Sequence, residues 1–131
     1  MVKLCFCIRR LPHLSREEFQ TYWRRTHPRA AGPDAARALG MRRYVQVRAL
    51  PEAVNRRVAS SRPGLEPAFD GIAEVWLDSV EAYERAWASP EGEATMKRLL
   101  EDEKNFIDWS RSTLFLAEEL VLIDETSAAE A

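Results

Sequence analysis

His27 is the side chain in this sequence best suited to moving protons, and it lies at a defined point of a predicted helix. It comes four residues after Trp23 and directly before Pro28. Because a residue before proline is disfavoured in helical geometry, we expect His27 in the last turn. There the helix dipole favours the imidazolium, whereas burial beside Trp23 favours the neutral ring. A ring balanced in this way suits proton transfer near neutral pH, but the position also suits a histidine that only caps carbonyls.

Residues on the predicted strands also carry groups for catalysis or binding. Glu74 stands between Ile72 and Trp76, where a partly dry cavity would raise the pKa of its carboxyl. An ion pair with an arginine on a neighbouring strand is the simpler explanation of this acid. Tyr44 and Gln46 offer a phenol and an amide that would orient an oxygenated ligand, or they contact a dimer partner.

Acidic residues also surround the apolar pair Phe106 and Ile107 near the end of a predicted helix. Most of these charges are expected to be solvated. Asp108 lies between Ile107 and Trp109, and from there it would reach the mouth of a cavity or orient an imidazole. Asp108 is therefore a candidate catalytic acid.

Cys5 and Cys7 project from the same face of a predicted strand, as two thiolate ligands would. A metal site needs further ligands, and the sequence has only His13 and His27 to add. We therefore expect buried thiols, with neither a metal nor another cofactor. The sequence has no glycine-rich phosphate loop, nucleophile elbow or His-Glu-x-x-His pattern. It thus gives no support to nucleotide binding, serine hydrolase or zinc protease activity.

The size and charge of the chain limit the classes of function. Its 131 residues suggest one domain, and 46% of them are hydrophobic, as in an ordinary globular protein. The net charge of −2 comes from interleaved acids and bases, which leaves no electrostatic footprint for nucleic acid. No apolar run approaches membrane-spanning length, and no charged leader precedes the first strand. We expect a soluble, cytoplasmic protein that binds neither nucleic acid nor a membrane.

Alternating side chains and turn residues predict four strands in a single domain of residues 1–123. The strands cover Val2–Arg9, Arg42–Arg48, Ile72–Asp78 and Thr113–Ile123. The last is apolar on both faces, which is typical of a strand that is buried centrally or extends across a partner. The prolines of Ala49–Phe69 indicate a long surface excursion without its own core, and Asp124–Ala131 is expected to be a flexible tail.

Two segments, Ser15–Trp23 and Ser79–Trp87, repeat the same order of capping serine, acid, aromatic residue and tryptophan at identical spacings. Glu18 completes a capping box in the first copy, and Ser89 before Pro90 starts a third helix. Each copy follows a strand and precedes another, so the chain consists of two βαβ halves. This predicts an α+β, ferredoxin-like βαββαβ fold, with a four-stranded antiparallel sheet and helices on one face.

The other face of such a sheet has no helices over it. Alternation predicts that it carries Cys5, Cys7, Arg9, Tyr44, Gln46, Arg48, Ile72, Glu74 and Trp76. Too many of these side chains are apolar or aromatic for a solvated surface. A two-fold dimer with sheet packed on sheet would cover them and enclose a cavity of mixed polarity in each subunit. We therefore expect a homodimer.

Several sequence blocks also occur in a recognisable order: I-R-R, S-R-E-E-F-Q-T-Y-W-R-R-T-H-P, R-R-Y-V-Q, F-D-G-I-A-E-V-W, S-P-E and D-E-K-N-F-I-D. Together they resemble the EthD-domain family of the dimeric α+β barrel superfamily, from Lys3 to about Ile123. The resemblance implies a compact dimer with one pocket per subunit, between the sheet and the helices. The excursion at residues 49–69 is similar to the variable segment of that family.

The resemblance also implies roles for particular residues. His27 matches the histidine of the family's W-x-x-x-H-P block, and Asp108 matches its terminal acid. Asp70, Glu74 and Trp76 match its D-G-x-A-E-x-W block. Relatives act on aromatic polyketide-type intermediates as cyclases, dehydratases, decarboxylases or cofactor-free oxygenases, and others are accessory proteins. Because function depends on the site, the fold does not choose among these chemistries.

Three functions therefore remain open. The first is a cofactor-independent lyase (dehydratase, decarboxylase or cyclase) acting on a hydroxylated aromatic or polyketide-like molecule, with His27 as general acid or base. Substrate contacts would come from Arg9, Tyr44, Gln46, Trp76 and Trp23. The second is a cofactor-free oxygenase with a similar substrate. The third is a non-catalytic accessory protein that binds a hydrophobic intermediate of a degradation or biosynthesis pathway.

Overall fold

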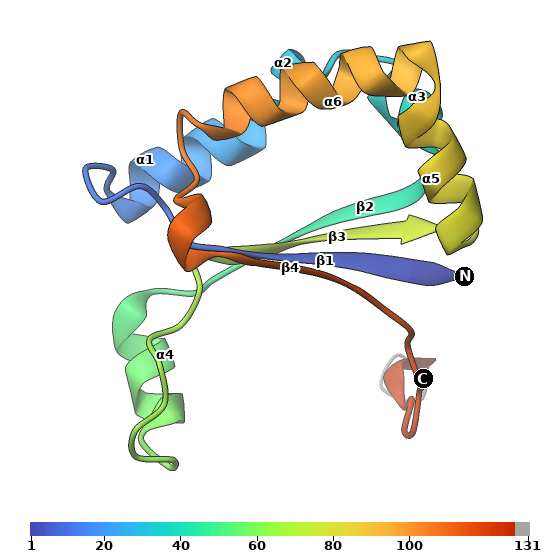
Figure 1. Cartoon of the computed structure of the whole chain (residues 1–131). Coiled ribbons are helices and arrows are strands. Elements are labelled where there is room, and N and C mark those ends of the chain that lie inside the picture. The colour runs from blue at the N-terminus through green and yellow to red at the C-terminus, as the bar shows by residue number, and fades with distance from the viewer. Residues whose placement is uncertain (128–131) are drawn as a thin grey trace.

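The computed structural model describes residues 1–127, and its centre is a four-stranded antiparallel sheet (Figure 1). The strands are β1 (Val2–Ile8), β2 (Met41–Arg48), β3 (Gly71–Leu77) and β4 (Thr113–Ala117). They lie in the order β2-β3-β1-β4, and every neighbouring pair is antiparallel. One layer of helices covers one face of this sheet. The predicted α+β, ferredoxin-like fold is thus confirmed.

The helix layer has two parts. The first is a continuous run of α1 (Arg16–Thr21), the π-helix η1 (Tyr22–Thr26) and α2 (His27–Ala31), followed by α3 (Ala35–Leu39). The second consists of α5 (Val80–Ala88) and α6 (Pro90–Glu103), and the 3-10 helix η2 (Trp109–Arg111) comes before β4. Ser15, Ser79 and Ser89 cap their helices as predicted. Within residues 1–127, no helix has the length and apolar character needed to cross a membrane.

The helix that carries His27 does not end there, contrary to the expectation from Pro28. It continues through α2, and η1 gives it a wider turn in which the His27 amide donates to the Tyr22 carbonyl. In this register the Trp23 carbonyl would accept from residue 28, but proline has no N–H. Gln46 of β2 supplies the missing donor, since its Nε2 lies 2.9 Å from the Trp23 carbonyl oxygen. Pro28 is therefore accommodated by a change in the hydrogen-bond register of the helix.

Aromatic side chains fill the core between the first helices and the sheet. Phe19, Trp23 and Phe106 are buried together. The ring centroid of Phe19 lies 5.5 Å from that of Trp23 and 5.8 Å from that of Phe106, in tilted pairs. Gly71 leaves room for the Trp23 ring, because a Cβ at this position would overlap that ring and lie 2.8 Å from the Val47 carbonyl oxygen.

The two faces of the sheet are not divided as the sequence suggested. Tyr44 pairs with Val75, and Gln46 pairs with Ala73. Val75 and Ala73 are buried under the helices, so Tyr44 and Gln46 lie on the helix-covered face. The expectation that these two residues and Arg48 share the uncovered face is wrong. Alternation with period two groups the side chains of a strand correctly but leaves open which group faces which way.

The uncovered face of the sheet is mainly apolar. The register confirms five predicted residues on this face, because Cys5 pairs with Glu74, Cys7 with Ile72, and Trp76 with Lys3 of β1. Arg9 follows the end of β1. Further apolar side chains join them from β2 and β4: Val45, Val47 and Phe115. Val47 is 40% exposed and Phe115 is 48% exposed. This face therefore offers a surface that a partner would cover.

β4 is an edge strand, because within residues 1–127 it pairs with β1 alone. The expectation of a central strand is wrong, and the strand ends at Ala117. The C-terminal segment, residues 118–127, continues on the side of the sheet away from the helix layer (Figure 1). It exposes 68–83% of each of its apolar side chains: Leu120, Val121, Leu122 and Ile123. Residues 128–131 of the predicted tail lie outside the described residues.

The excursion between β2 and β3, residues 49–69, projects from the same side of the sheet as an arm (Figure 1). It contains α4 (Glu52–Ala59), which has no buried residue. Arg9 fixes the base of the arm by donating hydrogen bonds of 3.1 and 2.9 Å to the Pro67 carbonyl oxygen. The Arg9 guanidinium also lies 4.1 Å from the centroid of the Phe69 ring. Arg16 binds the other end of the arm by donating a hydrogen bond to the Ala49 carbonyl oxygen.

We expect Gly71→Ala to lower the free energy of unfolding by about 1–3 kcal/mol, because its methyl group overlaps the buried Trp23 ring. Urea unfolding followed by tryptophan fluorescence measures the change. Ser61→Ala in the exposed arm is the control, and it should change the free energy of unfolding by less than about 0.5 kcal/mol. Equal stability of the two variants would contradict this packing.

Candidate functional site

His27 lies in the seam between α2 and α6, where it contacts an acid of α6. Its Nδ1 is 2.8 Å from Asp102 Oδ2, and the two side chains are 12% and 11% exposed. The His27 ring centroid also lies 4.9 Å from that of Phe106. A carboxylate here accepts a hydrogen bond from Nδ1 and leaves Nε2 as the free nitrogen of the neutral ring.

Tyr22 and Asn105 extend this pair to a network of four side chains. The Tyr22 hydroxyl donates to Asp102 Oδ1 at 2.6 Å. Asn105 Nδ2 donates to the Tyr22 oxygen at 3.1 Å and to Asp102 Oδ1 at 3.4 Å. Burial, together with the bond to Asp102, raises the pKa of Tyr22, so its hydroxyl remains a donor. Both oxygens of Asp102 are therefore engaged, and the carboxylate is held in one orientation.

The spacing of these residues explains how the network assembles. Asp102, Asn105 and Phe106 are three and four residues apart, so they point to the same side at the end of α6. Tyr22 and His27 are one π-helical turn apart, which aligns them along η1. Both rings then pack on Phe106, with centroids 5.0 and 4.9 Å away.

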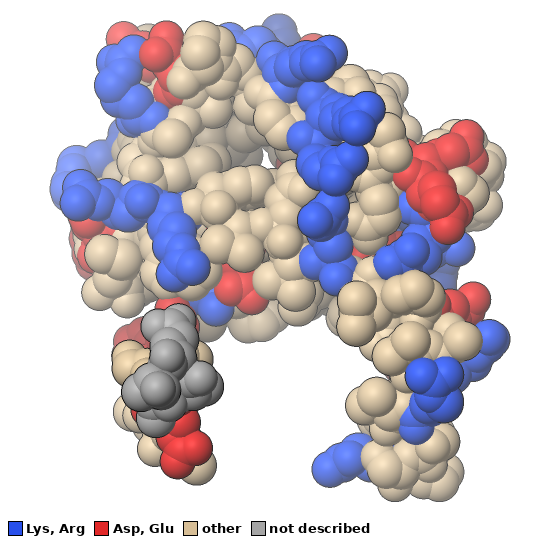
Figure 2. All heavy atoms as spheres, turned by 180° about the vertical axis from the view of Figure 1, so that it is seen from behind, with Lys and Arg blue, Asp and Glu red and all other residues tan. Residues whose placement is uncertain are grey.

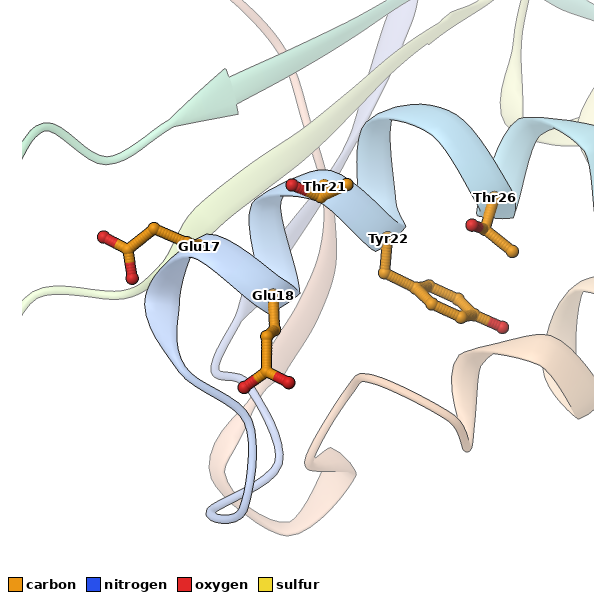
Figure 3. A pocket seen from close by; sticks show the side chains of 5 residues that line it. All are labelled: Glu17, Glu18, Thr21, Tyr22 and Thr26. Atoms are coloured by element: carbon orange, nitrogen blue, oxygen red, sulfur yellow. The ribbon is translucent and has the colours of Figure 1, made fainter.

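Two shallow depressions in the outer surface lie beside this network. Tyr22 lines the first, which has a volume of about 410 Å³. Its other lining residues are Glu17, Glu18, Thr21 and Thr26 (Figure 3). Asp102 and Asn105 line the second, of about 280 Å³, together with Ala30, Arg98 and Glu101. Tyr22, Asp102 and Asn105 thus border the outer surface, whereas His27 lines neither depression.

A second group of polar side chains faces the space between the sheet and the helices. Tyr44 is 42% exposed although it lies on the helix-covered face. Loss of hydration nevertheless raises the pKa of its phenol. A side chain that is exposed on a helix-covered face borders an opening between the sheet and the helices. We call this space the inner recess and define it by Tyr44, Gln46, Tyr83 and Glu103.

Glu103, the last residue of α6, brings an acid to the inner recess. Burial raises the pKa of its carboxyl, although Trp109 Nε1 donates to Oε1 at 3.0 Å and favours the ionised form. Burial is also the main cause of the raised pKa of Tyr44 and of Tyr83, and the charge of Glu103 adds to both. The charge of Glu103 therefore acts on both phenols.

Gln46 links the inner recess to the helix of His27. Its Nε2 donates to the Trp23 carbonyl at 2.9 Å and lies 3.4 Å from the Tyr44 hydroxyl oxygen. Trp23 precedes His27 by about one helical turn. Tyr44 on the sheet and the helix that carries His27 are thus separated by a single amide.

Glu74 and Trp76 lie on the opposite face of the sheet, away from the inner recess. Glu74 is in an ion pair, as the simpler interpretation suggested, but its partner is Lys3, with 2.8 Å between Nζ and Oε2. The Trp76 ring lies between Lys3 and Arg43, whose charged groups are 4.8 and 4.6 Å from its centroid. Its Nε1 donates to Glu119 at 2.6 Å. The structure does not bring these two predicted residues to His27.

Three other predicted residues make structural contacts. Arg9 holds the arm. Asp108 caps η2, since its Oδ1 accepts from the Ser110 amide at 3.1 Å and from the Ser110 hydroxyl at 2.6 Å. Trp23 is 1% exposed, so its ring belongs to the core. Among the predicted site residues, Tyr44 and Gln46 lie together, and Gln46 binds the helix that carries His27.

Asp102 and Glu103 are among the acids around Phe106 that the sequence led us to expect as solvated charges. They are adjacent, and successive helix residues point about 100° apart, so one reaches the seam and the other reaches the inner recess. In the sequence they form part of an acidic run at a helix end, which is typical of solvated charge. Their position before Phe106 was the available signal, because this residue lies in the core.

The described residues give no candidate metal centre. Within residues 1–127, no three His, Cys, Asp or Glu side chains are grouped so as to hold an ion. Cys5 and Cys7 are free thiols on the uncovered face, and burial raises the pKa of both. Raised thiol pKa values are typical of structural cysteines.

The sheet order and the single helix layer define a protein of the ferredoxin-like class. Residues 11–110 match the EthD domain, and the chain belongs to the EthD-domain family. No curated protein matches the sequence.

Several solved structures share the fold. An ethyl tert-butyl ether D (EthD) family protein from Bacillus halodurans is 23% identical with a TM-score of 0.58, over 92% of this chain and 99% of that one. An EthD-like protein from Ralstonia eutropha is 18% identical with a TM-score of 0.57, over 95% and 96%. A protein from Bacteroides fragilis, described as dimeric and ferredoxin-like, is 14% identical with a TM-score of 0.52, over 90% and 95%. At these identities the likeness concerns the fold alone.

We expect Glu103→Gln to stabilise the protein at pH 7 and to have no effect at about pH 4. Burial raises the folded-state pKa of Glu103 above the ordinary value of 4.5. The stability that the protonated carboxyl contributes is therefore complete below that value and is lost as the pH rises through the raised pKa. Glutamine stays neutral at every pH and keeps an oxygen that accepts from Trp109, so the variant does not lose this stability as the pH rises.

Urea unfolding between about pH 4 and pH 8 measures this difference. Glu101→Gln, an exposed position on the same helix, is the control and should follow the unmodified protein at every pH. A gain from Glu103→Gln that is equal at both ends of the range would contradict the pKa assignment.

Proposed function

We propose that the protein is a cofactor-independent lyase that acts on a hydroxylated aromatic or polyketide-like small molecule, with His27 as its general acid or base. The observation that carries this proposal is the 2.8 Å contact between His27 Nδ1 and Asp102 Oδ2. A carboxylate on one ring nitrogen directs proton transfer to the other, and it stabilises the imidazolium that forms. Tyr22 supports this role, because its hydroxyl holds the second oxygen of Asp102.

In this proposal the substrate occupies the inner recess. Tyr44 and Gln46 hold its phenol or carbonyl oxygen, and Tyr83 offers a second hydroxyl. Glu103 and Trp109 close the end of the recess, where they are joined by a hydrogen bond. The hydrogen bonds of Gln46 support this arrangement, since they connect Tyr44 to the helix that carries His27.

The proposed reaction is an elimination. For dehydration, His27 Nε2 removes a proton from the carbon next to the carbonyl, and Tyr44 stabilises the oxygen of the resulting enolate. The β-hydroxyl group then leaves with that proton as water while the carbon–carbon double bond forms. For decarboxylation, the imidazolium instead delivers a proton to the ring carbon as the bond to carbon dioxide breaks. A cyclase would use the same base to form the carbon nucleophile.

We also propose a homodimer that packs the uncovered sheet faces together. Val47 and Phe115 support this, because they leave 40% and 48% of their surface open on that face. The similar Bacteroides fragilis protein is described as dimeric. The cytoplasm is the proposed location, since its reducing conditions keep Cys5 and Cys7 free.

We expect His27→Ala to lower turnover by about 10² to 10⁴-fold. Asp102→Asn keeps the ring but removes the charge beside it, so turnover should fall by about 10 to 100-fold. His13→Ala is the control, because this histidine is exposed and lies outside the network. The measurement is product formation followed by mass spectrometry, with a panel of hydroxyaromatic acids and β-hydroxyketones. Full activity of His27→Ala would refute the proposal.

The same panel, run with and without oxygen, separates the lyase from the other two functions. We expect loss of water or carbon dioxide that depends on His27 and is the same under nitrogen. Product that gains oxygen atoms and disappears under nitrogen would instead identify an oxygenase. Saturable binding of the panel compounds with no change in their mass, and with little effect of His27→Ala, would identify a binding protein.

A further inference from the structure

Two segments of the chain project from the uncovered side of the sheet, and their described residues are largely exposed. They are the arm, residues 49–69, and the C-terminal segment, residues 118–127. Figure 1 shows them at opposite ends of the sheet, both on the side away from the helix layer. Figure 2 shows them from behind, on either side of an open space beneath the sheet. Neither segment is required to build the core.

The base of the arm is fixed although its tip is free. Arg9 is 9% exposed and binds the Pro67 carbonyl, and Arg16 binds the opposite end of the arm. Beyond these contacts, α4 buries none of its residues. A buried arginine thus fixes a helix that adds no buried residue to the core of its own domain. This arrangement indicates that the arm binds another molecule.

The tip of the arm and the C-terminal segment carry opposite charges. Residues 53–65 contain three arginines (Arg56, Arg57 and Arg62) and no acid. Residues 118–127 contain four acids (Glu118, Glu119, Asp124 and Glu125) and no lysine or arginine. Figure 2 shows the basic and acidic side chains on the two separate projections. Within one chain the sheet keeps these charges apart.

Exposed apolar side chains accompany the charges on both segments. On the arm, Leu50, Val58 and Leu65 are 63%, 72% and 56% exposed. On the C-terminal segment, Leu122 and Ile123 are 83% and 82% exposed. An apolar stripe rimmed by charge is typical of a surface that binds another chain. The two segments thus match each other both in charge and in apolar character.

A two-fold axis can bring the two segments together. If a second copy packs its uncovered face on this one with the ends of the sheet reversed, the arm of each copy meets the C-terminal segment of the other. We propose that the arm of one copy clasps the C-terminal segment of a second copy, so that each dimer contains two such contacts. This proposal rests on the homodimer proposed above and is independent of the chemistry at His27.

Charge reversal of each side of the clasp tests the proposal. The arm variant carries Arg56→Glu and Arg57→Glu, and the tail variant carries Glu118→Arg, Asp124→Arg and Glu125→Arg, which make the segment net positive. Sedimentation velocity at low salt gives the dimer dissociation constant of each protein. We expect each variant alone to dimerise about tenfold or more weakly than the unmodified protein, because both contacts in its dimer become repulsive.

An equal mixture of the two variants gives the decisive measurement. In a mixed dimer, the acidic arm of one variant meets the basic tail of the other, and the remaining arm and tail keep their natural charges. Both contacts are then attractive, so we expect the mixture to recover the affinity of the unmodified protein. The five substitutions combined in one chain should recover it as well, because that chain is complementary to itself.

The control carries Arg24→Glu and Arg25→Glu, an adjacent exposed pair in the helix layer, and it should dimerise like the unmodified protein. Variants that dimerise normally, or a mixture that fails to recover, would overturn the clasp and leave the sheet-to-sheet dimer standing. A monomeric unmodified protein would overturn both. Turnover assays of His27→Ala decide the chemistry separately, so the proposals fail independently.

Discussion

The missing N–H of Pro28 is the constraint on which the position of the candidate site depends. An α-helix cannot donate from this residue, and the chain adapts by widening one turn into η1. The widening aligns Tyr22 with His27 against Phe106. It also leaves the Trp23 carbonyl without a helical donor, and Gln46 from the sheet binds it. One proline thus sets the register of the catalytic candidate and ties its helix to the strand that lines the inner recess.

The polarity of β2 is the reverse of what a sheet with a solvated outer face would require. Its polar side chains Tyr44 and Gln46 face the helices, and its valines face outward. A polar inner side would destabilise a domain whose helices sealed the sheet, because unpaired polar groups would be buried. Here the inner recess keeps Tyr44 accessible, so this cost is avoided. The same reversal leaves the outer face apolar, which favours its burial by a second copy.

Local signals predicted much of this fold because they act over a few residues. The capping serines, the proline that starts α6 and the repeated order of cap, acid and aromatic residues placed the helices and the two βαβ halves correctly. The facing of β2 was missed, since alternation is symmetric and a register shift lies between Met41 and Arg43. The partner of His27 was missed as well, because Asp102 is 75 residues away in sequence. Such a contact leaves no periodic trace.

The end of α6 gives two adjacent acids different physical roles. Asp102 meets the Tyr22 hydroxyl and His27, so its charge has partners that stabilise it. Glu103 has a single indole N–H as its hydrogen-bond partner, and burial opposes its ionisation. An acid whose charge lowers the stability of the fold is typical of a functional site. In the inner recess, its neighbours Tyr44 and Tyr83 have raised pKa values and remain hydroxyl donors at neutral pH.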